Sequence, residues 1–377
     1  MPRKPAILSA FTAITFVALL WLSALGGFLL ATRAGTAASN TLRAAPQAVL
    51  REPPLAYACS AVERAAQVKA MRPDESSCYG AAFWPALFAA GLACRDVVAV
   101  SVGANKGYLL AHWADLLRPE LNVTPASLYA RFLAPPLREL IDFDVICGNC
   151  RDCDTAHVHT RVGPCAGTPG ALQLWAVEPV PGNVALLRGG LAAAVTEARG
   201  VRAEVRVEQV ALVGAPAPRT VAVEACSPGR ETCGVVEEGA PAGGGGTTVE
   251  VPAYTLDGWA AAHGVRTIDV LAIDTEGLDA PVLAGGATLL ARGGVRLLLF
   301  EYHDKRAWRE ATLQGVVAAL DIYGFDCYLL QKKLALRLTG CWDPAFEFKS
   351  WSNVMCARRA EEALAAALAA FATALTP

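Results

Sequence analysis

Three carboxylates stand directly after apolar runs that have the length and composition of buried strands. Glu178 follows residues 172–177, Asp274 follows residues 267–273, and Glu301 follows residues 295–300. The carboxyl ends of parallel strands meet at one edge of a sheet, so we expect the three side chains to share that edge. A buried charge costs several kcal/mol unless it is paired or solvated. Three acids on one edge of an apolar sheet therefore predict a polar cleft there.

A glycine turn follows another apolar run, residues 97–102. The turn reads Gly-Ala-Asn-Lys-Gly from Gly103 to Gly107 and leads into a helix-like segment. It is either a simple chain reversal or a ligand-binding loop. A dinucleotide fingerprint requires glycine where Asn105 and Tyr108 stand, which disfavours a nicotinamide-dependent oxidoreductase, and a Walker loop requires a different Gly-Lys order. The turn still brings the backbone close to an adenosine-type ligand that carries no phosphate.

Glu178 is the expected partner of such a ligand. An acid at the end of the second strand of a nucleotide-binding fold hydrogen-bonds the ribose hydroxyls. Glu178 opens the sequence Glu-Pro-Val-Pro-Gly-Asn, and residues 118–170 separate it from the glycine turn. The alternative is a surface glutamate that the flanking prolines stiffen.

Strand-like and helix-like segments alternate through the chain. Strands are expected at residues 97–102, 172–177, 205–213, 267–273, 295–300, 325–330 and 351–357, and helices at residues 108–117, 184–194, 281–292 and 311–323. The alternation predicts an α/β fold with a mostly parallel sheet covered by helices on both faces. Residues 118–170 interrupt it with poor periodicity and four cysteines. They are interpreted as an insertion within one domain, residues 56–377.

The amino terminus carries a long apolar segment. Residues 6–32 contain no charged side chain, and a bilayer core needs roughly 20 such residues. Arg3 and Lys4 precede the segment, so the positive-inside rule places the tail, residues 1–5, in the cytosol and the remainder across the membrane. The length favours an uncleaved signal anchor over a cleaved signal peptide. Residues 33–55, rich in small residues and proline, are expected to form a stem.

All 12 cysteines lie beyond the apolar segment. An even count after a signal anchor is typical of a protein that folds in an oxidising lumen. The residue types and spacing of zinc ligands occur at Cys147, Cys150, Cys153, His157, His159 and Cys165. In an oxidising lumen cysteines pair more readily as disulfides, so disulfides are favoured over a metal site here. Cys226 and Cys233 are expected to close a small loop in the same way.

The charge balance excludes one class of partner. The formal net charge is −2 and no basic stripe occurs, which argues against nucleic-acid binding. The apolar fraction of 54% is high for a wholly soluble enzyme. It reflects the amino-terminal segment and an abundance of alanine.

The order of the motifs resembles that of FkbM-type methyltransferases. The motifs are VSVGANKGY, VEPVPGN, VEQVAL, and IDTEGLDAPVLAGG with TLD upstream and FEYH downstream. The similarity spans roughly residues 97–358 without the insertion. It implies a class I methyltransferase Rossmann-like fold with a seven-stranded, mostly parallel sheet. It also implies S-adenosylmethionine as the cofactor and methyl transfer to an oxygen, often a sugar hydroxyl.

The resemblance implies roles for the residues of the cofactor site. Gly103, Asn105 and Gly107 would line the methionine and ribose part of S-adenosylmethionine. Glu178 would hold the ribose hydroxyls, and Ala211 would lie near the adenine. These positions come from three different segments of the chain, so the implied site depends on the expected sheet.

Four side chains are candidates for the chemical step: Asp274, Glu276, Glu301 and His303. By the resemblance, Asp274 and Glu276 would face the transferring methyl group. The sulfonium is already activated, so the protein mainly aligns an in-line displacement, worth up to about 7–11 kcal/mol. The attacking hydroxyl must also lose its proton, and a positioned base contributes about 10²–10⁴-fold. Glu276, Glu301 and His303 are the candidate bases, His303 having a structural role as its alternative, and Asp279 is expected to cap the next helix.

These observations combine into one hypothesis: a membrane-anchored O-methyltransferase of the Golgi or ER lumen that acts on a glycan or glycoconjugate hydroxyl. Two departures from the family pattern favour an alternative. Family members usually carry an acid at the cofactor-binding position of Ser101 and a lysine where Ala272 stands. The alternative is therefore a catalytically decayed methyltransferase fold that serves as a binding or scaffold protein of the secretory pathway.

Overall fold

The computed structural model describes residues 58–76, 78, 82–148, 150–151, 153, 169–236, 247–332 and 334–373. The chain divides into two units, Met1–Ala58 and Cys59–Pro377, and the helices and strands described below belong to the second. The expected signal anchor, residues 6–32, and the stem, residues 33–55, lie outside the described residues. Within the described part of the chain, no helix combines the length and apolar character needed to cross a membrane.

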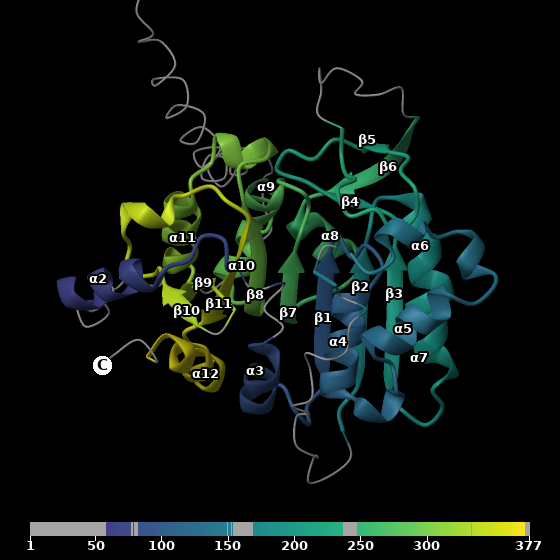
Figure 1. Ribbon diagram of the computed structural model, residues 1–377, viewed down its shortest axis with the longest axis horizontal. Helices are drawn as coiled ribbons and strands as arrows, with labels where there is room; N and C mark the ends of the chain where they lie inside the picture. The colour runs from purple at the N-terminus through teal and green to yellow at the C-terminus, as the bar shows by residue number, and fades with distance from the viewer. Residues whose placement is uncertain are drawn as a thin grey trace, which may run out of the picture. The chain divides into compact units, whose positions relative to one another are not determined.

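The core of the second unit is an eight-stranded mixed sheet with the strand order β10–β9–β11–β8–β7–β1–β2–β3 (Figure 1). Its strands are β1 (Val97–Val102), β2 (Leu172–Val177), β3 (Ala203–Glu208), β7 (Ile268–Ile273), β8 (Val295–Tyr302), β9 (Phe325–Leu330), β10 (Ala335–Arg337) and β11 (Ser352–Arg358). Neighbours from β3 to β8 are parallel. By contrast, β11 is antiparallel to both β8 and β9, and β10 is antiparallel to β9. Each of the seven expected strands contributes to this sheet, and β10 adds an eighth.

The expected strand at residues 205–213 is divided in two. Its second part, β4 (Ala211–Leu212), leaves the main sheet and pairs with β6 (Thr248–Tyr254). β6 also pairs with β5 (Thr220–Glu224), which gives a separate three-stranded sheet. Periodicity did not separate the two parts, because the apolar alternation continues from one into the other.

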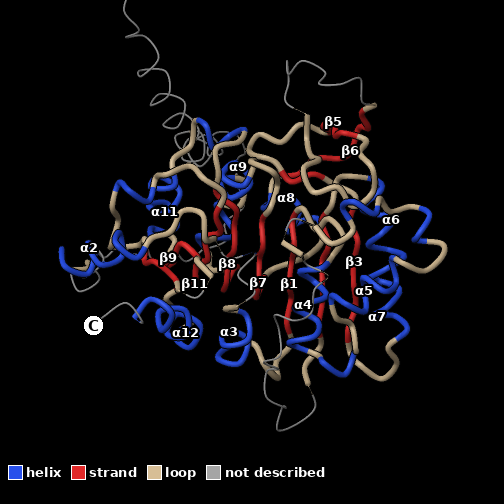
Figure 2. The backbone as a smooth tube through the Cα atoms, viewed as in Figure 1, coloured by secondary structure: helices blue, strands red, loops and turns tan. Residues whose placement is uncertain are grey.

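Helices cover both faces of the main sheet, as Figure 2 shows. One apolar cluster includes α3 (Trp84–Gly91), α4 (Tyr108–Leu117), α5 (Pro125–Phe132) and α12 (Glu362–Thr373), and the other includes α8 (Leu256–Ala262), α9 (Asp279–Ala284), α10 (Ala287–Ala291) and α11 (Leu313–Ile322). Val97 and Ala99 of β1 belong to the first cluster, whereas Val100 and Val102 belong to the second. Successive side chains of a strand point to opposite faces, so β1 contributes to both cores.

The remaining helices are short or continuous with one another. α2 (Ala61–Ala70) precedes α3, and α6 (Pro181–Leu186) continues through a π-helix (Leu187–Ala192) into α7 (Ala193–Glu197). Short 3₁₀ helices occupy Pro119–Leu121, Leu137–Glu139, Phe143–Val145, Arg306–Arg309 and Pro344–Phe346. The helix expected at residues 281–292 is divided into α9 and α10. Asp257 caps the second of these, because its carboxylate accepts hydrogen bonds from Thr288 N at 2.9 Å and Leu289 N at 2.7 Å.

The described cysteines are all disulfide-bonded, and none of them is free. The pairs with both members described are Cys59–Cys341, Cys78–Cys150, Cys147–Cys153, Cys226–Cys233 and Cys327–Cys356. Cys147, Cys150 and Cys153 therefore have no thiolate to offer, and the zinc alternative is wrong for these three residues. His157, His159 and Cys165 lie outside the described residues.

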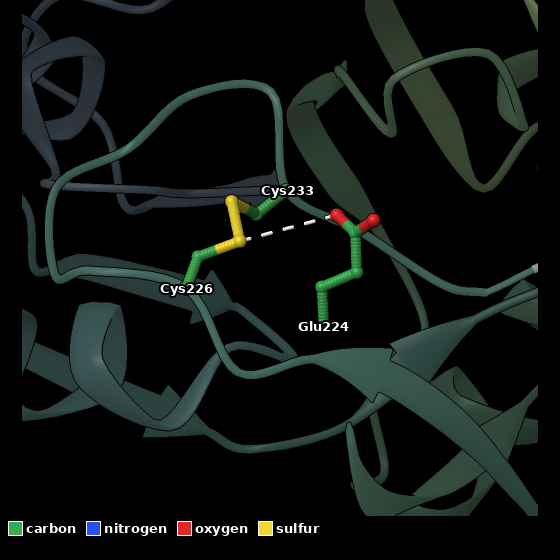
Figure 3. A group of neighbouring side chains, drawn as sticks. All are labelled: Glu224, Cys226 and Cys233. Atoms are coloured by element: carbon green, nitrogen blue, oxygen red, sulfur yellow. Dashed lines mark hydrogen bonds between the residues drawn. A yellow bond between two sulfur atoms is a disulfide. The ribbon is translucent and has the colours of Figure 1, made fainter. Parts of the chain in front are cut away.

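Cys226, Cys233 and Glu224 bring three potential metal-ligand atoms within 4.8 Å of one another. Figure 3 shows that the two sulfurs are bonded to each other. The 3.9 Å approach of Cys226 Sγ to Glu224 Oε2 is a contact only, because a disulfide sulfur carries no proton to donate. The expected small loop is confirmed, and the group lacks the thiolates of a metal site.

Arg118 closes the base of the insertion. Its side chain is fully buried. The guanidinium donates from Nε to Gly170 O at 2.8 Å and from Nη2 to Arg95 O at 2.7 Å. Arg118 and Gly170 stand at the two ends of the insertion, so a single side chain joins the point where the chain leaves the core to the point where it returns.

Candidate functional site

A cavity of about 480 Å³ lies at the carboxyl ends of β1, β2, β7 and β8. It is lined by all ten residues that the sequence proposed for the site: Ser101, Gly103, Asn105, Gly107, Glu178, Ala211, Asp274, Glu276, Glu301 and His303. The polar cleft expected at this edge of the sheet is therefore present, because parallel neighbours deliver their carboxyl ends to the same place. The individual roles of the ten residues stay predictions.

Backbone contacts fix the glycine turn against both neighbours of β1. Gly103 N donates to Val177 O at 2.9 Å, and Asp274 N donates to Val102 O at 2.9 Å. Gly103 has a φ of +77°, and a β-carbon at this position would lie 1.7 Å from Asp274 O. Glycine is therefore required twice, by the left-handed backbone and by the close approach of the turn after β7.

Glu178 is buried at the end of β2 and its carboxylate meets the glycine turn. Oε2 accepts a hydrogen bond from Asn105 N at 2.8 Å, and Oε1 accepts one from Val180 N at 2.9 Å. Burial raises the pKa of Glu178 to about 7, although these hydrogen bonds and Lys106 lower it. The surface alternative for Glu178 is wrong. Asn183 Nδ2 donates a longer hydrogen bond to Oε1 at 3.4 Å, so about one of the four acceptor positions of the carboxylate remains for a ligand.

The opposite end of the cavity is acidic. Asp274 lines the cavity and is exposed there, although neighbouring protein groups shield its carboxyl from bulk water. Desolvation, followed by the charges of Glu301 and Glu276, raises the pKa of Asp274 well above its ordinary value. Glu276 has a φ of +55°, and its Oε2 accepts a hydrogen bond from Lys305 Nζ at 2.8 Å. Desolvation also raises the pKa of Glu301 to about 8. Perturbed acids of this kind gather at sites that transfer protons.

Trp351 holds one oxygen of Glu301, and His303 lies close to the other. Trp351 Nε1 donates to Glu301 Oε1, whereas His303 Nε2 lies 3.1 Å from Glu301 Oε2 without a hydrogen bond between them. Lys305 N donates to His303 Nδ1 at 2.9 Å, so the proton of a neutral ring must reside on Nε2. Burial lowers the pKa of His303 to about 4, which keeps the ring neutral near pH 7. A neutral His303 therefore has no free nitrogen to accept a proton, and Glu276 and Glu301 remain the candidate bases.

The comparison with protein families agrees with this geometry. The family model of the methyltransferase FkbM domain matches residues 101–327, more than half of the chain. The chain belongs to this family. The matched residues run from β1 into β9 and contain all ten residues proposed from the sequence. No curated protein and no solved structure matches the chain significantly.

The two departures from the FkbM pattern are neighbours in the sheet. Ser101 of β1 is the direct register partner of Ala272 of β7, and both are buried beside the cavity. The resemblance led us to expect an acid at the first position and a lysine at the second. Because the two positions are register partners, uncharged residues at both leave no isolated buried charge at this point of the sheet.

The sequence did not predict one wall of the cavity in this FkbM domain. The loop that Cys226–Cys233 closes lies against the glycine turn, although the two are more than 120 residues apart in sequence. Lys106 Nζ donates to Gly229 O at 2.6 Å and pairs with Glu231 at 3.0 Å, while Asn105 Nδ2 donates to Arg230 O at 3.0 Å. The short spacing between Cys226 and Cys233 predicted a closed loop, but not that the loop lies against the glycine turn. Lys106 is therefore a structural cation that binds this loop.

Asp279 is not the helix cap that the sequence predicted. The N-cap of α9 is Leu278, and no side chain caps it. Asp279 is fully buried, and its Oδ1 accepts a 3.4 Å hydrogen bond from Thr275 N. Its Oδ2 has no hydrogen-bond partner among the described residues. Desolvation, followed by the charge of Asp274, raises the pKa of Asp279 to about 8, so the buried side chain is neutral near pH 7.

Replacing Asp279 by asparagine is expected to stabilise the methyltransferase domain at alkaline pH. The folded pKa is raised, so the stabilising contribution of the protonated aspartic acid is full below the ordinary pKa of 3.8, falls as the pH rises above that value, and is lost once the pH has risen through about 8. Asparagine keeps the shape and does not titrate. Thermal unfolding at about pH 9 is expected to give a Tm roughly 2–4 °C above that of the unsubstituted protein, with little difference at about pH 4. Asp74→Asn, at an exposed position, is the control, and an equal loss of Tm at both pH values would contradict the expectation.

Proposed function

We propose that this chain is an S-adenosylmethionine-dependent O-methyltransferase whose acceptor is a hydroxyl of a glycan or glycoconjugate. One observation carries the proposal: a single cavity has Glu178 at one end and Asp274, Glu276 and Glu301 at the other. The first acid suits the ribose of an adenosine cofactor, and the others suit a positive sulfonium and a hydroxyl that must lose a proton. Membership of the FkbM family supports methyl transfer as the reaction.

The residues of the cavity fit this cofactor. Asn105 Oδ1 is buried without a hydrogen-bond partner among the described residues, as is expected of an atom that meets a ligand. Gly103 allows the glycine turn and the turn after β7 to approach each other closely at the cavity. The volume of about 480 Å³ lies within the roughly 300–1,000 Å³ of small-molecule sites. The excess of carboxylates near Asp274 favours a cation by Coulomb attraction.

S-adenosylmethionine supplies, when bound, a methyl group that is already activated for in-line displacement. The protein must orient the acceptor and take its proton. Glu301 has a raised pKa close to neutral pH, which is the range in which a general base is most effective. Trp351 holds one of its oxygens in place by a hydrogen bond, and the other oxygen lies 3.1 Å from His303 Nε2. Glu301 accepts the hydroxyl proton as the new oxygen–carbon bond forms and later releases that proton to water.

The proposed setting is the Golgi or ER lumen, with a single-pass type II membrane anchor at residues 6–32. The length of that apolar segment supports the anchor. Disulfides support an oxidising compartment, and three of the disulfide-bonded cysteines, Cys78, Cys150 and Cys233, line the cavity itself.

Isothermal titration of the oxidised full-length chain with S-adenosylhomocysteine, the demethylated cofactor, tests the proposal. The unsubstituted protein is expected to bind it. Glu178→Gln is expected to raise Kd by about tenfold or more, because a hydrogen bond to a charged group contributes about 1.5–3 kcal/mol. Glu250→Gln, at an exposed position, is the matched control. Failure of folded, oxidised protein to bind would overturn the proposal.

A second candidate is a scaffold or binding protein on a decayed methyltransferase fold. Ser101 and Ala272 favour it, because they replace two charged residues of the family beside the cavity. The enzyme and the scaffold protein differ in whether they transfer a methyl group. The scaffold predicts binding of S-adenosylhomocysteine without transfer of a labelled methyl group from S-adenosylmethionine, whereas the enzyme predicts both.

A further inference from the structure

Trp351 is a large aromatic side chain that the fold leaves partly exposed. It immediately precedes β11, lines the cavity, and is 38% exposed. By contrast, Trp84, Trp113, Trp259 and Trp308 are fully buried. Burial of an indole removes a large apolar area from water and is strongly favourable. An indole held partly open inside a ligand cavity therefore indicates a surface that a ligand covers.

The loop before Trp351 is held rigidly. Lys349 Nζ donates to the carbonyl oxygens of Trp308, Arg309 and Ala311 at 2.8, 3.1 and 3.3 Å. Lys349 N donates to Tyr302 Oη at 3.0 Å, and Tyr302 Oη donates to Glu347 Oε1 at 2.9 Å. The indole is thus presented in a fixed position, which reduces the entropy lost when a ligand binds to it.

The hydrogen bond to Glu301 fixes how the indole faces the cavity. Trp351 donates from Nε1, and this N–H bond lies in the plane of the ring. The edge of the indole therefore points to the carboxylate, and its faces take no part in that contact. A flat apolar group stacked on the exposed face would lie alongside Glu301. Asn353, the register partner of Glu301 in the β8–β11 pair, adds an amide to the same wall of the cavity.

The charged side chains at this end of the cavity determine which kind of acceptor ring can bind beside Trp351. The acids Asp274, Glu276, Glu301 and Asp304 line this end, and the cation Lys305 is paired with Glu276 at 2.8 Å. Glu301 must be deprotonated to act as the base, so a ring that carries a carboxylate, sulfate or phosphate would meet a like charge beside the reacting hydroxyl. A ring that carries an ammonium would lie close to the positive sulfonium of the cofactor. An uncharged ring with hydroxyl groups avoids both repulsions and can hydrogen-bond to the carboxylates and the amide.

We infer that Trp351 is the acceptor-binding platform of this enzyme and stacks on an uncharged pyranose whose reacting hydroxyl lies beside Glu301. The inference rests on the proposed function and narrows its acceptor to neutral sugars. Trp351 serves in two ways, since its face binds the sugar ring and its N–H holds the base. Phenylalanine preserves the face and removes the donor, whereas leucine removes both. The two substitutions therefore separate the two roles.

Saturation-transfer NMR on the oxidised full-length protein tests the inference. The protein is prepared in a detergent without a sugar headgroup and saturated with S-adenosylhomocysteine. The probes are the methyl pyranosides of glucose, galactose and mannose, with methyl glucuronide as the anionic and methyl glucosaminide as the cationic comparison. At least one neutral probe is expected to bind, and each charged probe to bind at least about fivefold more weakly than its neutral counterpart.

The variants give the decisive comparison. Trp351→Leu is expected to weaken binding of the neutral sugar by about tenfold or more, and Trp351→Phe by less than about threefold. Both variants are expected to bind S-adenosylhomocysteine as tightly as the unsubstituted protein, which shows that the fold is retained. Loss of S-adenosylhomocysteine binding by the unsubstituted protein would count against the proposed function. Retained cofactor binding with no neutral sugar bound, with tighter binding of a charged probe, or with equal sugar binding by Trp351→Leu would overturn the inference about Trp351.

Discussion

Replacing Gly103 by alanine is expected to abolish S-adenosylhomocysteine binding and to lower the Tm markedly. The added β-carbon would lie 1.7 Å from Asp274 O, which is far inside van der Waals contact. Asp274 cannot withdraw freely, because its backbone N–H is bound to Val102 O at 2.9 Å. A left-handed backbone at a non-glycine residue costs roughly 1–2 kcal/mol by itself, and the clash adds to that cost. Thermal unfolding and isothermal titration measure the two effects.

Gly200→Ala is the matched control for Gly103→Ala. Gly200 has a φ of +85°, and a β-carbon there would meet nothing within 4 Å. The control therefore carries the backbone strain without the clash, and it lies outside the cavity lining. It is expected to lose a little Tm and to bind S-adenosylhomocysteine normally. If Gly103→Ala behaves in the same way as Gly200→Ala, the close approach of the two turns does not shape the cofactor site.

Glu301→Gln is expected to slow methyl transfer by about 10²–10⁴-fold, the usual contribution of a positioned base. Glutamine keeps the size and the carbonyl that accepts from Trp351 Nε1, but it cannot take up a proton. The affinity for S-adenosylhomocysteine is expected to change by less than about twofold. Incorporation of labelled methyl from S-adenosylmethionine into a total glycoconjugate fraction measures transfer. Unchanged transfer with Glu301→Gln would exclude Glu301 as the base.

The pH dependence of the unsubstituted enzyme provides an independent check. Glu301 must be deprotonated to act as a base, and burial raises its pKa to about 8. The rate of methyl transfer should therefore rise with pH up to about 8 and then level off, and Glu301→Gln should remove this rise. Glu310→Gln is the control, because Glu310 is exposed and lies outside the cavity lining. A rise that persists in Glu301→Gln would assign the titration to another group.

The rim of the cavity could be predicted from local patterns. Glu178, Asp274 and Glu301 each follow an apolar run; β2 and β7 end with their runs, whereas β8 continues to Tyr302 and includes Glu301. A parallel sheet then brings these ends together, so no knowledge of side-chain contacts was needed. The glycine turn could be predicted in a similar way. Glycine adopts positive φ values readily, and Gly103 and Gly107 both do so in the structure.

Trp351 could not be placed in the same way. It precedes β11, and the start of a strand in a parallel sheet would lie at the far edge from the cavity. Because β11 is antiparallel to β8, its beginning meets the end of β8 beside Glu301. The apolar pattern of a strand does not state its direction. The pairing of Cys59 with Cys341 was equally hidden, because spacing along the chain does not specify disulfide connectivity.

The buried side chain of Arg118 has a consequence for how this protein can change. Its guanidinium joins the two ends of the insertion at one point. The insertion is therefore attached to the rest of the domain at a fixed position. Cys150, which belongs to the insertion, lines the cavity. We therefore expect a change in the insertion to alter the cavity wall at Cys150 while β1 and β2 stay in register.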